Sequence, residues 1–196
     1  MADPTPNPSP IREVQIEALV VMRIIKHSTS TFPIPATGCV VGMDITSPPG
    51  TQLQITNSFP YPASVPDPST QDQYYQADAA SLAAAAPRAK SNANYQNEMI
   101  KYLREVNVDA QAVGWYISTS MGNFVNQNFI ENQFFFQKAT DEKMVALVFD
   151  ASKSSAGSLN LKAYRLSPTF MVSYRDGKFS TERYHTTYSH NDSGRR

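Results

Sequence analysis

Apolar residues recur at helical spacing in three stretches of the chain. Residues three and four positions apart share one face of a helix, so this spacing predicts amphipathic helices. We expect helices over about Glu17–His27, Asn94–Val106 and Phe124–Gln137. The apolar stripe of the first helix consists of Ile16, Leu19, Val20, Ile24 and His27, and that of the second consists of Tyr95, Met99, Leu103 and Val106.

Short apolar runs bounded by turn residues predict strands before and between these helices. Thr37–Ile45 and Gln52–Phe59 flank the turn sequence Ser47-Pro48-Pro49-Gly50 and so predict a hairpin. Three further strands are expected at Ala112–Thr119, Met144–Asp150 and Ser158–Arg165. Because strands and helices interleave, we expect an α/β or α+β fold with a mixed sheet.

The uneven distribution of the prolines divides the chain into segments. Four of the fourteen prolines lie in the first ten residues, which favours a disordered lead-in over residues 1–12. Four more open the Ala-rich stretch Pro60–Lys90, which offers no sustained apolar face and is interpreted as a mobile insertion. One domain over residues 13–170, carrying this insertion, is therefore expected, followed by a polar tail over residues 171–196.

Composition narrows the classes of function that fit the chain. Hydrophobic residues make up 41% of the 196 residues, enough for a core, and 17 basic residues balance 17 acidic ones. That balance excludes a wholesale polybasic binder of nucleic acid or membrane surfaces, whereas a local basic patch, and with it a direct contact with RNA, stays open. The apolar runs are far shorter than the roughly 20 residues of a membrane span, and the first ten residues do not resemble a signal peptide. With one cysteine the simplest interpretation is a soluble protein of a reducing compartment, and the expected location is cytoplasmic.

The segment Val113–Thr119, VGWYIST, resembles the central strand of the MPN domain, an α+β fold with a mixed, curved sheet flanked by helices. In the catalytic members this strand carries a His-x-His pair, whose two rings face the same side and bind zinc together with a carboxylate. The resemblance places Ile117 and Thr119 at the two histidine positions and Pro35 at the upstream glutamate position. Isoleucine and proline have no side-chain donor for a metal. The resemblance therefore implies no zinc, no cofactor and no enzymatic activity.

Two further positions of the catalytic motif, a serine and an aspartate, fall around Asn126–Gln127 and Phe129–Ile130. Neither pair contains the expected residue. The resemblance therefore implies that the helix after this strand also lacks its catalytic residues.

Four stretches match one non-catalytic branch of the family, the h-subunit branch of eukaryotic translation initiation factor 3. They are VQIEALVVMRIIKH, QITNSFPYP, NVDAQAVGWYISTSMGNF and GSLNLKAYRLSP, and together they frame residues 14–168. The resemblance implies a scaffold subunit that supports recruitment of mRNA and initiator tRNA to the small ribosomal subunit. The implied partners are other initiation factor 3 subunits, above all the MPN-containing f subunit, and no membrane.

Other interpretations of the chain stay open at this point. An inactive MPN subunit of the proteasome lid or of the signalosome is the nearest alternative, and the branch-specific stretches disfavour it. An isopeptidase is disfavoured by the missing ligands, and a stand-alone RNA-binding module by the zero net charge. Members of the family continue beyond the domain into a helical tail, whereas Tyr174–Arg196 is polar, so assembly into the full complex is left open.

Several reactive residue types have ordinary structural explanations. Cys39 lies within an apolar strand and is expected to be a buried thiol, and Trp115 on a central strand is expected in the core. His27 is expected at the end of the first helix, in a capping or surface role. His185 and His190 are expected to be solvated in the tail.

The first helix carries more apolar bulk than one buried face needs. Leu19, Val20 and Ile24 can serve the core of the domain. Val21, Met22 and Ile25 are left over, and they are the candidate interface for a second MPN domain.

Overall fold

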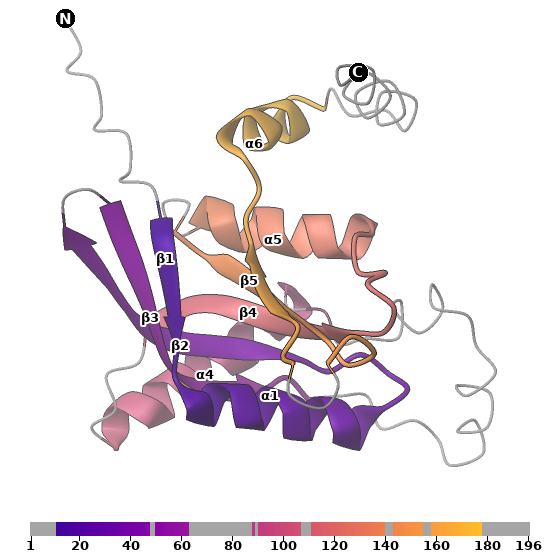
Figure 1. Ribbon diagram of the computed structural model, residues 1–196. Helices are drawn as coiled ribbons and strands as arrows, with labels where there is room; N and C mark the ends of the chain where they lie inside the picture. The colour runs from indigo at the N-terminus through magenta and orange to yellow at the C-terminus, as the bar shows by residue number, and fades with distance from the viewer. Residues whose placement is uncertain are drawn as a thin grey trace, which may run out of the picture. The chain divides into compact units, whose positions relative to one another are not determined.

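The computed structural model describes residues 11–47, 50–62, 88, 90–106, 111–139, 143–154 and 158–177. Six strands form one sheet in the order β1-β3-β2-β4-β5-β6 (Figure 1). The strands are β1 Ile11–Ile16, β2 Thr37–Ser47, β3 Gly50–Pro60, β4 Gln111–Thr119, β5 Val145–Asp150 and β6 Leu161–Tyr164. β1 pairs with β3, and β4 with β5, in parallel, whereas the other neighbours are antiparallel. The expected hairpin and mixed sheet are confirmed.

The edge strand β1 was not expected from the sequence. Its residues Ile11, Val14 and Ile16 are half-buried beside β3, and they lie directly after the proline-rich segment. The expected lead-in over residues 1–12 is therefore wrong at Ile11 and Arg12, which belong to this strand. Residues 1–10 lie outside the described residues.

Four α-helices are described, α1 Ala18–Thr31, α4 Ala93–Glu105, α5 Gln127–Ala139 and α6 Pro168–Arg175, with the 3-10 turn η2 Lys90–Asn92 before α4. α1 extends beyond its expected end at His27, since the hydroxyls of Ser30 and Thr31 both donate to the His27 carbonyl. α5 begins later than expected because Asn126 caps it: its Oδ1 accepts from the Phe129 amide at 2.8 Å.

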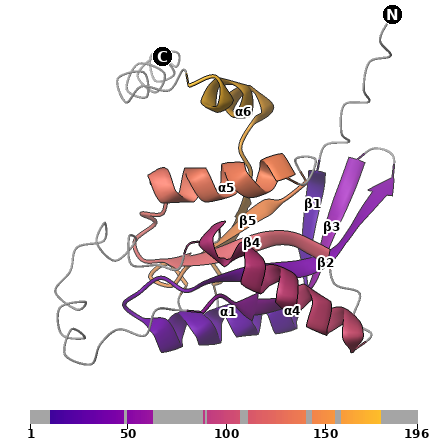
Figure 2. The same cartoon turned by 180° about the vertical axis from the view of Figure 1, so that it is seen from behind.

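Helices cover both faces of the sheet, and Figures 1 and 2 show α1 and α5 on opposite sides of it. Val20 and Ile24 of α1 pack on one face, in the cluster that contains Leu53, Ile55 and Tyr116. The other cluster joins Trp115 and Ile117 of β4 to Ile100 of α4 and to Phe129 and Phe136 of α5. Trp115 is 1% exposed, which confirms it as core.

A buried chain of polar side chains fixes α5 on the sheet. The Trp115 indole donates to Gln133 Oε1 at 2.8 Å, and Gln133 Nε2 donates to Gln137 Oε1 and to the Met144 carbonyl, each at 3.0 Å. Gln133 and Gln137 have no exposed surface. Each buried donor and acceptor of this chain thus finds a partner, and the pairing links β4, α5 and the start of β5.

Contacts divide the chain into two units, Met1–Arg165 and Leu166–Arg196. In the second unit Ser167 caps α6 by accepting from the Phe170 amide, and the Phe170 and Tyr174 rings stack. The expected polar tail over residues 171–196 is therefore helical at its start, up to Arg175. Residues 178–196, with His185 and His190, lie outside the described residues.

The expected insertion at about 60–90 begins later than its first boundary. Pro60 ends β3, and Tyr61 is buried with its hydroxyl 2.6 Å from Gln96 Oε1 of α4. Lys90 already belongs to η2. Residues 63–87 and 89 lie outside the described residues.

The described helices were compared with the length and hydrophobicity of a membrane span, and none of them reaches both.

The Gln133 network predicts a marked loss of stability on truncation. Replacing Gln133 by Ala leaves the Trp115 indole and the Met144 carbonyl without partners and opens a cavity, so the free energy of unfolding should fall by about 3 kcal/mol. Gln127→Ala in the same helix removes only an exposed bond to Glu131 and should cost about 0.5 kcal/mol or less. Urea unfolding of both variants gives the comparison, and equal losses would contradict the role of Gln133.

Candidate functional site

The carboxyl end of β4 carries Ile117 and Thr119, the two positions at which the resemblance led us to expect the metal-binding histidines of catalytic MPN domains. Ile117 and Thr119 are two residues apart and so point to the same face of the sheet, the face of Trp115. Ile117 is 9% exposed and packs in the core cluster, and the Thr119 hydroxyl is turned toward the carbonyl of Ser120 at 3.5 Å.

The start of β2 brings Pro35 to the same corner. In the antiparallel pairing of β2 and β4, Thr37 lies opposite Ile117. The ladder continues one step further, since the Ser118 amide donates to the Ala36 carbonyl at 2.8 Å and the Ala36 amide donates to Ser118 Oγ at 2.7 Å. Continuing that register places Pro35 opposite Thr119. Pro35, Ile117 and Thr119 therefore lie in one corner of the sheet.

The side chains around the start of α5 serve its packing. Asn126 caps the helix, as described above, and Phe129 is buried with its ring centroid 5.3 Å from that of Trp115 and 5.2 Å from that of Phe124. The Phe129 ring packs between those of Trp115 and Phe124 and so holds α5 against β4.

A carboxylate that the sequence reasoning missed lies beside the corner. Asp150 ends β5, pairs in register with Thr119 and is 3% exposed. Its Oδ1 accepts from the amide and hydroxyl of Ser152, at 3.1 and 2.6 Å, and its Oδ2 lies 3.7 Å from Lys153 Nζ. Its place in the sequence, an acidic residue at the end of an otherwise apolar strand, could have indicated a carboxylate at this edge of the sheet. The Asp150 carboxylate is thus occupied by hydrogen bonds within its own turn and by the ion pair with Lys153.

The donors of this corner do not fit a zinc ion. Zinc in a hydrolytic site takes three nitrogen, sulfur or carboxylate ligands and a water. Ile117 and Pro35 supply none, and the part of the chain that the structure describes contains no group of three or more His, Cys, Asp or Glu that could hold a metal.

Cys39 is a structural thiol. It is fully buried in β2, and its Sγ lies 3.6 Å from the carbonyl oxygens of Val40 and Gly114. Burial raises the pKa of the Cys39 thiol far above its ordinary range, so it carries no thiolate for nucleophilic attack.

His27 is not at the end of α1, and the expected capping role is wrong. It lies inside the helix, half-buried, with Nδ1 2.8 Å from the Tyr116 hydroxyl of β4. Burial lowers the pKa of His27, which favours the neutral ring, whose Nδ1 can accept a hydrogen bond from the Tyr116 hydroxyl. His27 thus joins α1 to the central strand.

The solvent side of α1 carries an apolar stripe, Leu19, Met22 and Ile25, which we call the α1 patch. These side chains are 45%, 59% and 39% exposed. Leu19 was expected in the core and is not, because Val20 and Ile24 occupy the buried face. Of the expected interface residues, Met22 and Ile25 are exposed and Val21 is half-buried.

Arg23 fixes the orientation of this helix from its other flank. Its guanidinium donates to the Asn57 side chain and, at 3.2 Å, to the Ser58 carbonyl of β3. The α1 patch is therefore presented on a helix that is tied to the sheet.

The mixed sheet, its two helical layers and the corner at the end of β4 define an α+β domain of the MPN type. The chain belongs to the JAB1/Mov34/MPN/PAD-1 ubiquitin protease family, whose model matches residues 9–142.

Curated relatives point to one branch of this family. The chain is 59% identical over 88% of its length to a protein of Coccidioides immitis that is named as the H subunit of eukaryotic translation initiation factor 3. Proteins of the same name from Aspergillus fumigatus and Sclerotinia sclerotiorum are 56% and 55% identical over 90% and 93% of the chain. The matched part is 46–48% of these proteins, so the chain spans about half the length of the curated relatives it matches.

His27 predicts a pH dependence of stability. Because the pKa of His27 is lower in the fold than its unfolded value near 6.5, the unfolded chain binds the proton first as the pH falls. The contribution of this residue is therefore complete above about pH 6.5 and declines below it, down to the folded pKa. Urea unfolding of the wild type and of His27→Gln between pH 5 and 8 should show the wild type losing stability relative to the variant at the acid end. Parallel profiles would contradict the assignment.

Proposed function

We propose that this chain is a non-catalytic scaffold component of eukaryotic translation initiation factor 3, acting in the cytoplasm. The names of its relatives support the assignment to the complex, and the MPN family model matches residues 9–142 of this chain. In this role the chain supports recruitment of mRNA and initiator tRNA to the small ribosomal subunit by holding other subunits. An inactive subunit of the proteasome lid or signalosome is not favoured, since the relatives carry the initiation factor name.

The single observation that carries the non-catalytic part is the chemistry of the corner at the end of β4. A metal-dependent isopeptidase needs a bound ion to activate water. At the corresponding positions the side chains of Pro35, Ile117 and Thr119 provide one hydroxyl between them, and Asp150 is paired to Lys153.

The partner that fits best is the MPN-containing f subunit of the same factor, docked on α1. A stable interface buries roughly 1,600 Å² around an apolar centre. The α1 patch, extended by the half-buried Val21, supplies that centre on a helix without acidic residues. Arg23 and Lys26 lie on the same helix, so a partner surface with an apolar strip and acidic margins would complement it.

The loss of the metal site predicts that the purified chain holds no stoichiometric zinc and cleaves no ubiquitin chain. Elemental analysis of protein prepared without chelator should give far less than one zinc per chain, and a catalytic MPN protease prepared in parallel serves as the control. One zinc per chain that disappears in Thr119→Ala would contradict the proposal.

The partner assignment predicts that charge on the α1 patch blocks assembly. Met22→Glu/Ile25→Glu should reduce co-purification with the f subunit at least tenfold, since a buried charge without a partner weakens an interface strongly. Leu159→Glu, at a side chain 52% exposed beyond β5, is the matched control and should leave co-purification unchanged.

Circular dichroism separates this result from misfolding. Both variants should keep the spectrum and melting temperature of the wild type. An unfolded double variant would place Met22 and Ile25 in the core, and a folded one that still binds would place the interface elsewhere.

A further inference from the structure

The methionines that the structure describes differ widely in exposure. Met22 of α1 and Met121, between β4 and α5, are 59% and 84% exposed, and Met43 of β2 is 39% exposed. Met144 and Met171 are buried. An oxidant must reach the sulfur atom to react with it. Of these methionines, Met22 and Met121 are therefore the most open to oxidation in the folded chain.

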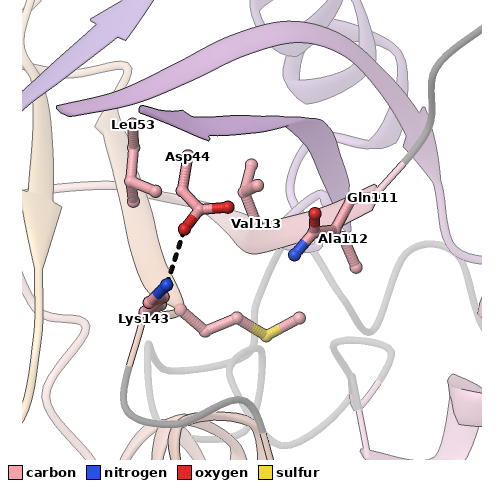
Figure 3. A pocket seen from close by; sticks show the side chains of 7 residues that line it. Asp44, Leu53, Gln111, Ala112, Val113 and Lys143 are labelled. Atoms are coloured by element: carbon pink, nitrogen blue, oxygen red, sulfur yellow. Dashed lines mark hydrogen bonds and ion pairs between the residues drawn. The ribbon is translucent and has the colours of Figure 1, made fainter. Parts of the chain in front are cut away.

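Met144 is the protected case and serves as an internal reference. It lines a small cavity at the start of β4, together with Asp44 and Lys143, whose ion pair at 2.6 Å is drawn in Figure 3. Its side chain is 2% exposed and belongs to the core cluster of Trp115. Met144 therefore reacts only when the domain opens, and its oxidation reports unfolding.

Met22 occupies the middle of the α1 patch. Leu19 and Ile25 lie three residues before and three residues after it, so the three side chains share one face of the helix. Met22 is the most exposed of the three. Under the proposed function this face is the apolar centre of the interface with the f subunit, and the present inference rests on that function. A partner docked there would remove the Met22 thioether from water.

Hydrogen peroxide converts the thioether of a methionine into a sulfoxide. A lone pair of the sulfur attacks one peroxide oxygen and the O–O bond breaks. The transferred oxygen gives its proton to the departing hydroxide, which leaves as water, so that the sulfur is oxidised by two electrons and the peroxide is reduced. The apolar side chain has then gained a strong hydrogen-bond acceptor, and methionine sulfoxide reductases reverse the change.

We propose that Met22 is an oxidation site whose conversion to the sulfoxide weakens docking on the α1 patch. On the free chain, water solvates the sulfoxide oxygen and the fold is unchanged. In the interface this oxygen would lie among apolar side chains, and a buried acceptor without a partner costs binding free energy. Lys26, four residues further on, is exposed. If it donated to the sulfoxide, its ammonium would be drawn over the patch and would lose water on docking, which also weakens the interface.

The test treats the full chain with hydrogen peroxide, removes the peroxide with catalase and then adds untreated f subunit. Peptide mass mapping should show oxidation of Met22 and Met121, with Met144 intact. The affinity for the f subunit should fall about tenfold, as expected for one unpaired acceptor in an apolar interface. Methionine sulfoxide reductase with dithiothreitol as the reductant should restore it.

Two variants assign the loss to one sulfur atom, each compared with itself before and after treatment. Met22→Leu has no thioether at this position, so peroxide should leave its affinity unchanged. Met121→Leu is the matched control because Met121 lies outside the α1 patch, and its affinity should fall on treatment as that of the wild type does.

Protection in the complex gives a second, independent readout. Because docking and oxidation compete for the same side chain, bound f subunit should slow the oxidation of Met22 at least fivefold, with the rate at Met121 unchanged. Protection of Met121 in place of Met22 would contradict the proposal.

The remaining outcomes separate this inference from the function on which it rests. An untreated chain that does not bind the f subunit would overturn both. An untreated chain that binds, and binds equally well with Met22 fully oxidised and Met144 intact, would overturn the oxidation site alone. A loss of affinity that persists in Met22→Leu would overturn it as well, since another residue would then be responsible.

Discussion

The register in which β4 lies between β2 and β5 is the constraint on which the rest of the domain depends. Its antiparallel ladder to β2 brings the Pro35 end of that strand to Thr119, and its parallel ladder to β5 brings Asp150 to the same place. The glycine of the GWY sequence allows this closeness: a Cβ on Gly114 would lie 2.3 Å from the Val145 carbonyl oxygen. A side chain there would push β5 away and separate the residues of the corner.

The same frame fixes both helical layers of the domain. Trp115, on the face of Ile117 and Thr119, is engaged through Gln133 in fixing α5, and His27 ties α1 to the other face through Tyr116. The side chains of β4 thus hold two helical layers in place. Because of this packing, the sheet holds α1 and its apolar patch in place whether or not a metal binds at the corner.

Much of the fold could be predicted from the sequence, because strands and helices with strong periodicity dominate the core. The hairpin, Trp115 and the exposure of Met22 and Ile25 were all expected from local pattern. β1 was missed because six residues next to a proline-rich segment carry little pattern, and they become a strand only through pairing with β3. The predictions for Leu19 and His27 were wrong for a related reason. Spacing along a helix does not determine whether Leu19 or the adjacent Val20 packs against the sheet. It also does not show that His27 lies next to the buried Tyr116. The absence of ligands at Pro35, Ile117 and Thr119 was readable from residue types, whereas Asp150 and its pairing to Lys153 required the fold.

The central claim, that this domain acts through a helix surface and not through the corner at the end of β4, is tested most directly by hydrogen–deuterium exchange. The full chain is compared alone and in complex with the f subunit of initiation factor 3. We expect protection on binding to be concentrated in α1, over residues 18–31, with little change in residues 32–36 and 119–126 around the corner. Protection concentrated at the corner, with α1 exchanging as it does in the free chain, would contradict the claim.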